Sequence, residues 1–145
     1  VLLNSADDVG AAGIDFSSGY GNANAFKAMQ TIRSGRVING SISSNSTQAF
    51  NITVPDGIKQ LKVTLAWTDP PALPNTGKAL LNDLDMVLEH IASGQSWQPW
   101  VLSSFPHKDS LEKLPVRKRD TLNTAEQISI SNPQAGIYSI RINSS

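Results

Sequence analysis

The spacing of apolar residues changes once along the chain, from a helical period to an alternating one. Between residues 21 and 33 one helical face is apolar: Ala25, Ala28, Met29 and Ile32. Asn22 precedes this face and can cap a helix, and Gly35 follows it as a residue that ends one. The pattern predicts a helix over residues 21–33.

After Gly35 the apolar residues alternate with polar ones in five stretches: 50–54, 62–68, 84–89, 127–131 and 138–142. Residues 37–43 are a further candidate strand, and Pro, Asp, Asn and Gly fill the turns between stretches. Residues 103–123 are polar and unpatterned, and we interpret them as a long loop. The fold predicted is all-β, an antiparallel jelly-roll β-sandwich with a short N-terminal helical appendage.

Composition excludes several classes of protein. The 12 basic and 12 acidic residues cancel, which argues against a nucleic-acid or membrane-surface binder. Cysteine is absent, which excludes a disulfide framework, a thiolate nucleophile and a Cys-ligated metal. No run of 18 apolar residues is present, so no membrane-spanning helix is expected. A charged fraction of 17% with many hydroxyl and amide side chains is typical of an extracellular β domain.

Two segments near the N-terminus resemble a known family. Residues 3–10 (LNSADDVG) and 19–25 (GYGNANA), followed by Ala28, closely resemble the end of the catalytic domain of subtilisin-like serine proteases. In that family the nucleophilic serine lies in an upstream G-T-S-M-A-x-P motif, which this chain lacks. The resemblance implies that residues 1–36 are the last part of a catalytic domain whose triad lies elsewhere.

The remainder resembles the C-terminal β-barrel domain of certain alkaline bacterial subtilases, which is similar in fold to the P domain of proprotein convertases. Residues 65–71 (LAWTDPP) and 81–88 (LNDLDMVL) carry this resemblance, and 120–128 and 133–140 fit the closing strands. Such domains usually have one more strand after the one matching 138–142. We therefore expect either that another segment completes the sandwich or that the chain is a piece of a longer protein.

Hydrolysis by this chain alone is not expected. A serine nucleophile needs a base within hydrogen-bond reach and a third group that orients the base. The only histidines are His90 and His107, and neither lies near a serine motif. Both are interpreted as surface residues.

Calcium is the one cofactor that the sequence suggests. Six candidate oxygen ligands lie near strand ends: Asp69, Asp83, Asp85, Asp120, Asn123 and Glu126. Asp83 and Asp85 are two residues apart and share a face if both lie on a strand, where a hard cation would relieve their repulsion. The resemblance also points to calcium. The alternative is that these acids cap turns by bonding to local backbone.

The aromatic residues allow a binding role. Trp97 and Trp100 could form a platform for a sugar or peptide, or could pack at the edge of the core, whereas Trp67 is expected in the core. The resulting hypothesis is a domain, residues 37–145, that stabilises the catalytic domain of a secreted subtilisin-like endopeptidase. The alternative is a module that binds a polymeric substrate or a cell surface, through carbohydrate or protein. A structural adhesin-like domain is a weaker third hypothesis.

Overall fold

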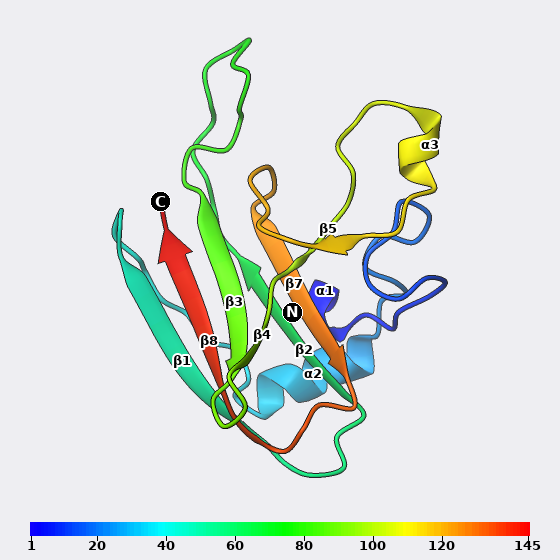
Figure 1. Cartoon of the computed structure of the whole chain (residues 1–145), viewed down its shortest axis with the longest axis vertical. Helices are drawn as coiled ribbons and strands as arrows, with labels where there is room; N and C mark the ends of the chain where they lie inside the picture. Colours follow the sequence, from blue (N-terminus) through cyan, green and yellow to red (C-terminus); the bar gives the residue numbers. More distant parts are fainter. The chain divides into compact units, whose positions relative to one another are not determined.

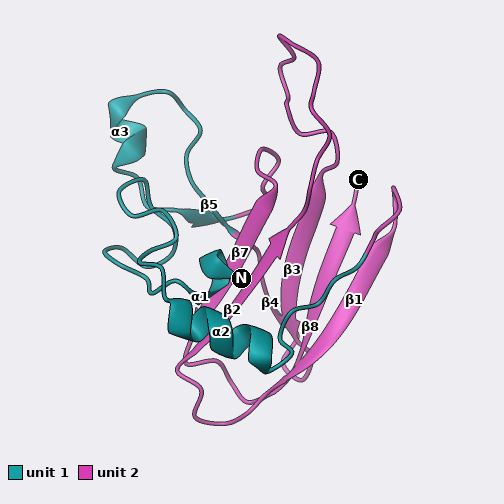
Figure 2. Ribbon diagram, turned by 180° about the vertical axis from the view of Figure 1, so that it is seen from behind, with its two compact units in different colours: residues 1–40, 100–117 teal, residues 41–99, 118–145 magenta.

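The computed structural model describes residues 1–145, and the chain divides into two compact units (Figure 2). The first unit combines residues 1–40 with residues 100–117, and the second combines residues 41–99 with residues 118–145. The segment 100–117 therefore belongs with the N-terminal residues, although it lies in the middle of the β-rich part of the sequence. None of the helices has the length and the apolar content of a membrane-spanning segment.

The second unit contains two antiparallel sheets (Figure 1). The larger has the order β1-β8-β3-β4 and is made of β1 (Thr47–Val54), β8 (Gly136–Ser144), β3 (Leu84–His90) and β4 (Gln95–Trp97). The smaller pairs β2 (Gln60–Ala66) with β7 (Ala125–Ser131). The pairings β1–β8 and β2–β7 join segments far apart in sequence, so neither sheet forms from local hairpins alone.

The core of the second unit lies between its two sheets. Its buried members come from both sheets: Val54, Met86, Leu88, Ile128, Tyr138 and Ile140. The half-buried Leu61, Val63 and Leu65 of β2 pack against them. Alternation works here because successive side chains on a strand point to opposite faces, so every second residue enters the core. The prediction of an all-β antiparallel sandwich is confirmed, and the jelly-roll connectivity stays a prediction.

The first unit contains three short helices and one two-stranded ladder: α1 (Leu2–Ser5), α2 (Ala25–Arg33), α3 (Lys108–Leu111), β5 (Trp100–Val101) and β6 (Val116–Arg117). Asn24 caps α2, because its side chain accepts a hydrogen bond from the Lys27 backbone N–H at 2.9 Å. The prediction that Asn22 is the cap is wrong, since Asn22 instead exchanges backbone hydrogen bonds with Asp7. Gly35 does follow the helix with a positive φ of 66°.

The strands predicted from alternation all exist, with ends shifted by a few residues. Residues 37–43 form no strand and pair with no strand of either sheet. The short elements β4, β5, β6 and α3 were not predicted, since two to four residues carry no detectable period. Trp67 is only half-buried and lies outside the core cluster, which corrects the expectation of a core residue. Its indole N–H donates to the Asn82 carbonyl at 2.9 Å.

Candidate functional site

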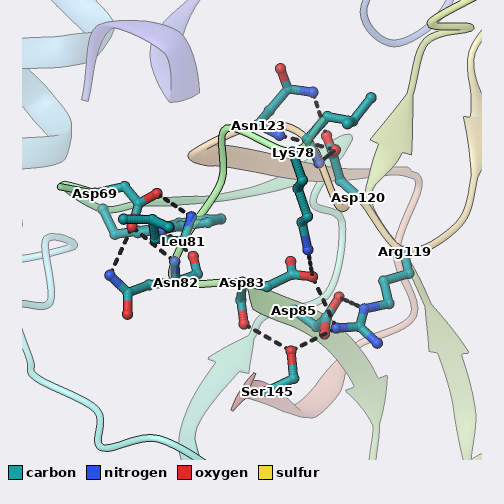
Figure 3. Close-up of polar contacts among 12 residues, drawn as sticks. Asp69, Lys78, Leu81, Asn82, Asp83, Asp85, Arg119, Asp120, Asn123 and Ser145 are labelled. Atoms are coloured by element: carbon teal, nitrogen blue, oxygen red, sulfur yellow. Dashed lines mark hydrogen bonds and ion pairs between the residues drawn. The ribbon is translucent and has the colours of Figure 1, made fainter. Parts of the chain in front are cut away.

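Carboxylates and two cations meet where β3 begins (Figure 3). Asp83 immediately precedes the strand, and its Oδ2 lies 3.0 Å from Lys78 Nζ and 3.1 Å from Arg119 Nη2. Asp85 lies two residues further along, and its Oδ1 is 2.6 Å from Arg119 Nε. One guanidinium therefore bridges two carboxylates on the same face of the strand, as residues two apart should allow. Burial raises the pKa of Asp85, with a further rise from Asp83, while Arg119 opposes both.

Two other candidate ligands accept hydrogen bonds from backbone N–H groups. The Asp69 carboxylate accepts the backbone N–H groups of Leu81 and Asn82, and these bonds lower its pKa. Asp120 accepts the backbone N–H groups of Leu122 and Asn123, and the Asn123 side chain donates to it as well at 2.7 Å. Asp120 is an Asx-type turn residue, which was the alternative interpretation from the sequence, whereas Asp69 bonds to backbone 12 and 13 residues further along the chain.

Glu126 occupies a different environment, inside the sandwich. It lies on β7 with 1% of its surface exposed, and its Oε2 accepts a hydrogen bond from the Met86 backbone N–H of β3 at 2.6 Å. The neighbouring strand β4 pairs with β3 only from Leu88 onward, so Met86 lies beyond its reach. Glu126 thus supplies the acceptor that a longer β4 would have provided. Its Oε1 is buried and has no hydrogen-bond partner.

Burial raises the pKa of Glu126 from 4.5 to about 8. The Met86 N–H opposes the rise, whereas the nearby charges of Asp85 and Asp120 add to it. The Asp120 backbone N–H has the smallest effect, since it makes no well-formed hydrogen bond to this carboxyl. At neutral pH this side chain is therefore a neutral acid that accepts one backbone hydrogen bond.

These six residues do not converge on one point as ligands. No group of three or more acidic or histidine side chains is placed to hold a metal ion. Asp83 and Asp85 are neutralised by Arg119, and Asp69 and Asp120 are engaged with backbone N–H groups. This arrangement does not fit calcium, which prefers six to eight oxygens. Calcium binding stays a prediction from the sequence, to be tested directly.

A variant of Arg119 tests whether the carboxylates bind calcium. We expect Arg119→Ala to lower the free energy of unfolding by roughly 2 kcal/mol, because it leaves Asp85 without a cation and Asp83 with Lys78 alone. Calcium should then stabilise the variant more than it stabilises the wild type, by about 1.4 kcal/mol at ten times its dissociation constant. Urea unfolding with and without calcium measures both effects. Lys118→Ala, at an exposed neighbouring base, is the control. An equal calcium effect in Arg119→Ala and in the wild type would contradict the prediction.

The two candidate platform tryptophans belong to different units. Trp97 lies on β4 in the second unit, and its ring centroid is 6.0 Å from that of Tyr138. Trp100 lies on β5 in the first unit, with the Arg117 guanidinium 3.9 Å from its ring centroid. It also lies against Gly13, where an added Cβ would come within 3.2 Å of the indole. Both tryptophans are half-buried, but Trp100 already contacts Arg117 and Gly13 within its own unit, whereas Trp97 lies beside a cleft of the second unit.

His90 is buried, which corrects the expectation of a surface residue. It is the last residue of β3, is 1% exposed, and lies 4.8 Å from the Tyr138 ring centroid. Its Nδ1 is 2.8 Å from Ser93 Oγ, and its Nε2 is buried without a hydrogen-bond partner. A catalytic serine–histidine pair needs a third group on the second ring nitrogen, and this pair has none. His107, in contrast, is exposed and caps α3.

The fold and site together define an antiparallel β-sandwich with a charged cluster at one end of β3 and an aromatic cluster at the other. A scan against protein-family models finds no match to the chain. A search of curated proteins finds no match either.

Proposed function

We propose that the chain is the C-terminal accessory region of a secreted, extracellular subtilisin-like serine endopeptidase. In this proposal residues 1–36 close the catalytic domain, and the sandwich stabilises that domain without hydrolysing substrate itself. The sequence resemblance supplies the family, and the exposed apolar face of α2 is the structural observation that favours it.

That face is defined by three side chains, Phe26, Met29 and Ile32, which are 63%, 44% and 61% exposed. Ala28 is the only residue of α2 that is buried. A helix of nine residues is marginal in water unless its apolar side packs against a partner. A catalytic domain of the same protein would provide that partner, and the sandwich would then be held close to it.

The proposed mechanism is a rise in the barrier to unfolding. A protease cleaves its own partly unfolded molecules, so its working stability is a rate of inactivation rather than an equilibrium. A sandwich with its own core resists local unfolding and keeps the last helix of the catalytic domain in place. Calcium, if it binds, would add stability by mass action.

The test uses the intact protease and a small peptide substrate, which does not depend on docking to a polymer. We expect removal of residues 37–145, which comprise the sandwich and also residues 100–117 of the first unit, to shorten the thermal inactivation half-life about tenfold or more, which corresponds to about 1.4 kcal/mol in the barrier. The double variant Phe26→Ser/Ile32→Ser should also shorten the thermal inactivation half-life of the intact protease. In the 145-residue chain alone it should leave unfolding of the sandwich unchanged. An unchanged half-life after truncation would contradict the proposal.

A binding module is the second candidate function, and a cleft beside Trp97 favours it. This role would dock the protease onto a polymeric substrate or a cell surface. It does not compete with the first role, because the two use different residues.

A further inference from the structure

A cleft of about 260 Å³ lies within the second unit, at the end of the sandwich opposite the charged cluster. It is bounded by the end of β3, by β4 and by the turn between β7 and β8. Six of its lining residues carry aromatic or amide side chains: His90, Gln95, Trp97, Asn132, Gln134 and Tyr138. No Asp, Glu, Lys or Arg lines it.

The aromatic side of the cleft is held by packing. Tyr138 is fully buried, and its hydroxyl donates to the Gln134 carbonyl at 2.9 Å. The rings of His90 and Trp97 both lie against Tyr138, at centroid distances of 4.8 and 6.0 Å. Trp97 is half-buried, so part of its indole is accessible to a ligand. The three aromatic residues form a rigid wall, because the innermost ring is fixed by both packing and a hydrogen bond.

The polar side of the cleft consists of amide groups that the fold does not use. The side chains of Gln95, Asn132 and Gln134 are exposed and make no hydrogen bond within the protein. Asn132 is held with a positive φ of 46°, and its backbone N–H donates to the Lys59 carbonyl at 2.8 Å. The side-chain amide of Asn132 therefore lies on a turn whose backbone is held in place. Each amide carries both a donor and an acceptor, so the three can recognise a neutral polar ligand.

We propose that this cleft binds a single neutral sugar ring. A pyranose presents an apolar C–H face that fits an indole, and a rim of hydroxyls that can pair with amide donors and acceptors. The volume lies just below the usual range for drug-sized ligands, which suits one ring rather than a chain. A peptide would need an edge strand to pair with, and β4 has only three residues. This site does not depend on whether the sandwich stabilises a protease.

The test is a titration of the uniformly ¹⁵N-labelled full chain with methyl β-glucoside and, separately, N-acetylglucosamine, at concentrations up to tens of millimolar. We expect saturable shifts limited to backbone amides of residues 90–97 and 131–138 and to one tryptophan indole N–H. The double variant Gln95→Ala/Gln134→Ala should weaken affinity about tenfold or more, since two hydrogen-bonding groups are lost. Both side chains are exposed, so the rest of its spectrum should match the wild type.

Gln30→Ala is the matched control, because Gln30 is an exposed glutamine in the first unit, and it should bind as the wild type does. Shifts that fail to saturate with both sugars overturn the proposal. Equal affinity in the wild type and the cleft variant overturns it as well. A third arm uses acetyl-Gly-Gly-amide: saturable shifts with this probe and none with the sugars would replace a sugar site by a peptide site. Each of these results leaves the inactivation half-life of the protease, and so the proposed function, untouched.

Discussion

Replacing Gly136 with alanine is expected to lower the free energy of unfolding of the sandwich by about 3–5 kcal/mol. Gly136 begins β8 with a φ of 146°, a conformation that residues with a side chain rarely adopt. An added Cβ would also lie 2.5 Å from Nε2 of the buried His90. Backbone strain and a steric clash in the core therefore act together. Urea unfolding followed by tryptophan fluorescence measures the loss.

Two further variants separate the causes. Gly94→Ala has a positive φ of 69° with no atom near an added Cβ, so it should cost only about 1–2 kcal/mol, from backbone strain. His90→Ala combined with Gly136→Ala removes the ring that the new Cβ would meet. The double variant should lose less stability than the sum of the two single variants, by about 1–3 kcal/mol. Strict additivity would show that the imidazole does not oppose the side chain at position 136.

The strands could be predicted because burial in a two-sheet sandwich follows from local alternation. Tyr138 and Ile140 enter the core and Ser139 does not, and each of these positions is visible in the sequence. The role of Gly136 could not be predicted in the same way. The sequence marks it as a turn glycine after Asn132, but its contact with His90 joins residues 46 positions apart and exists only once β3 and β8 have paired.

In the candidate site, too, the roles that depend on local sequence could be predicted, and the roles that depend on tertiary contacts could not. Asp120 caps a turn within a short polar motif, as the alternative weighed from the sequence expected, whereas Asp69 bonds to backbone 12 and 13 residues away. Arg119 has no such signal, because it lies in residues 103–123, which are unpatterned and were interpreted as a long loop. Its ion pairs with Asp83 and Asp85 span more than 30 residues and follow from tertiary structure. The same holds for Glu126, which bonds to Met86 across the core.

Glu126 is unusual because the group that completes the edge of β3 is ionisable and almost fully buried. Glu126→Ala removes the acceptor of the Met86 N–H and leaves a cavity, so at pH 4.5 it should destabilise the fold by roughly 2–4 kcal/mol, and by less as the pH rises towards 8. Glu126→Gln keeps an acceptor and nearly the same volume but cannot ionise. The comparison between these two variants separates packing from protonation.

The pH dependence follows from the direction of the pKa shift. The carboxyl has a pKa of about 8 in the folded protein against 4.5 as the reference value, so the folded state holds the proton more tightly than the unfolded state does. Below pH 4.5 both states are protonated, and the stabilising contribution is fully present. As the pH rises towards 8 the unfolded state loses its proton first, and stability falls by at most about 1.4 kcal/mol per pH unit.

We therefore expect the wild type to lose a few kcal/mol of unfolding free energy between pH 4.5 and 8, and Glu126→Gln to lose much less. Urea unfolding across this range, with the exposed Glu112→Gln as control, measures the difference in slope. The raised pKa of Asp85 contributes to both proteins, so the difference between their slopes reports mainly on Glu126. Parallel slopes in the two proteins would mean that Glu126 ionises in the folded state as readily as it does in the unfolded chain. The Met86 N–H would then be bonded to a carboxylate at neutral pH, and the interior near β3 would be more polar than its burial indicates.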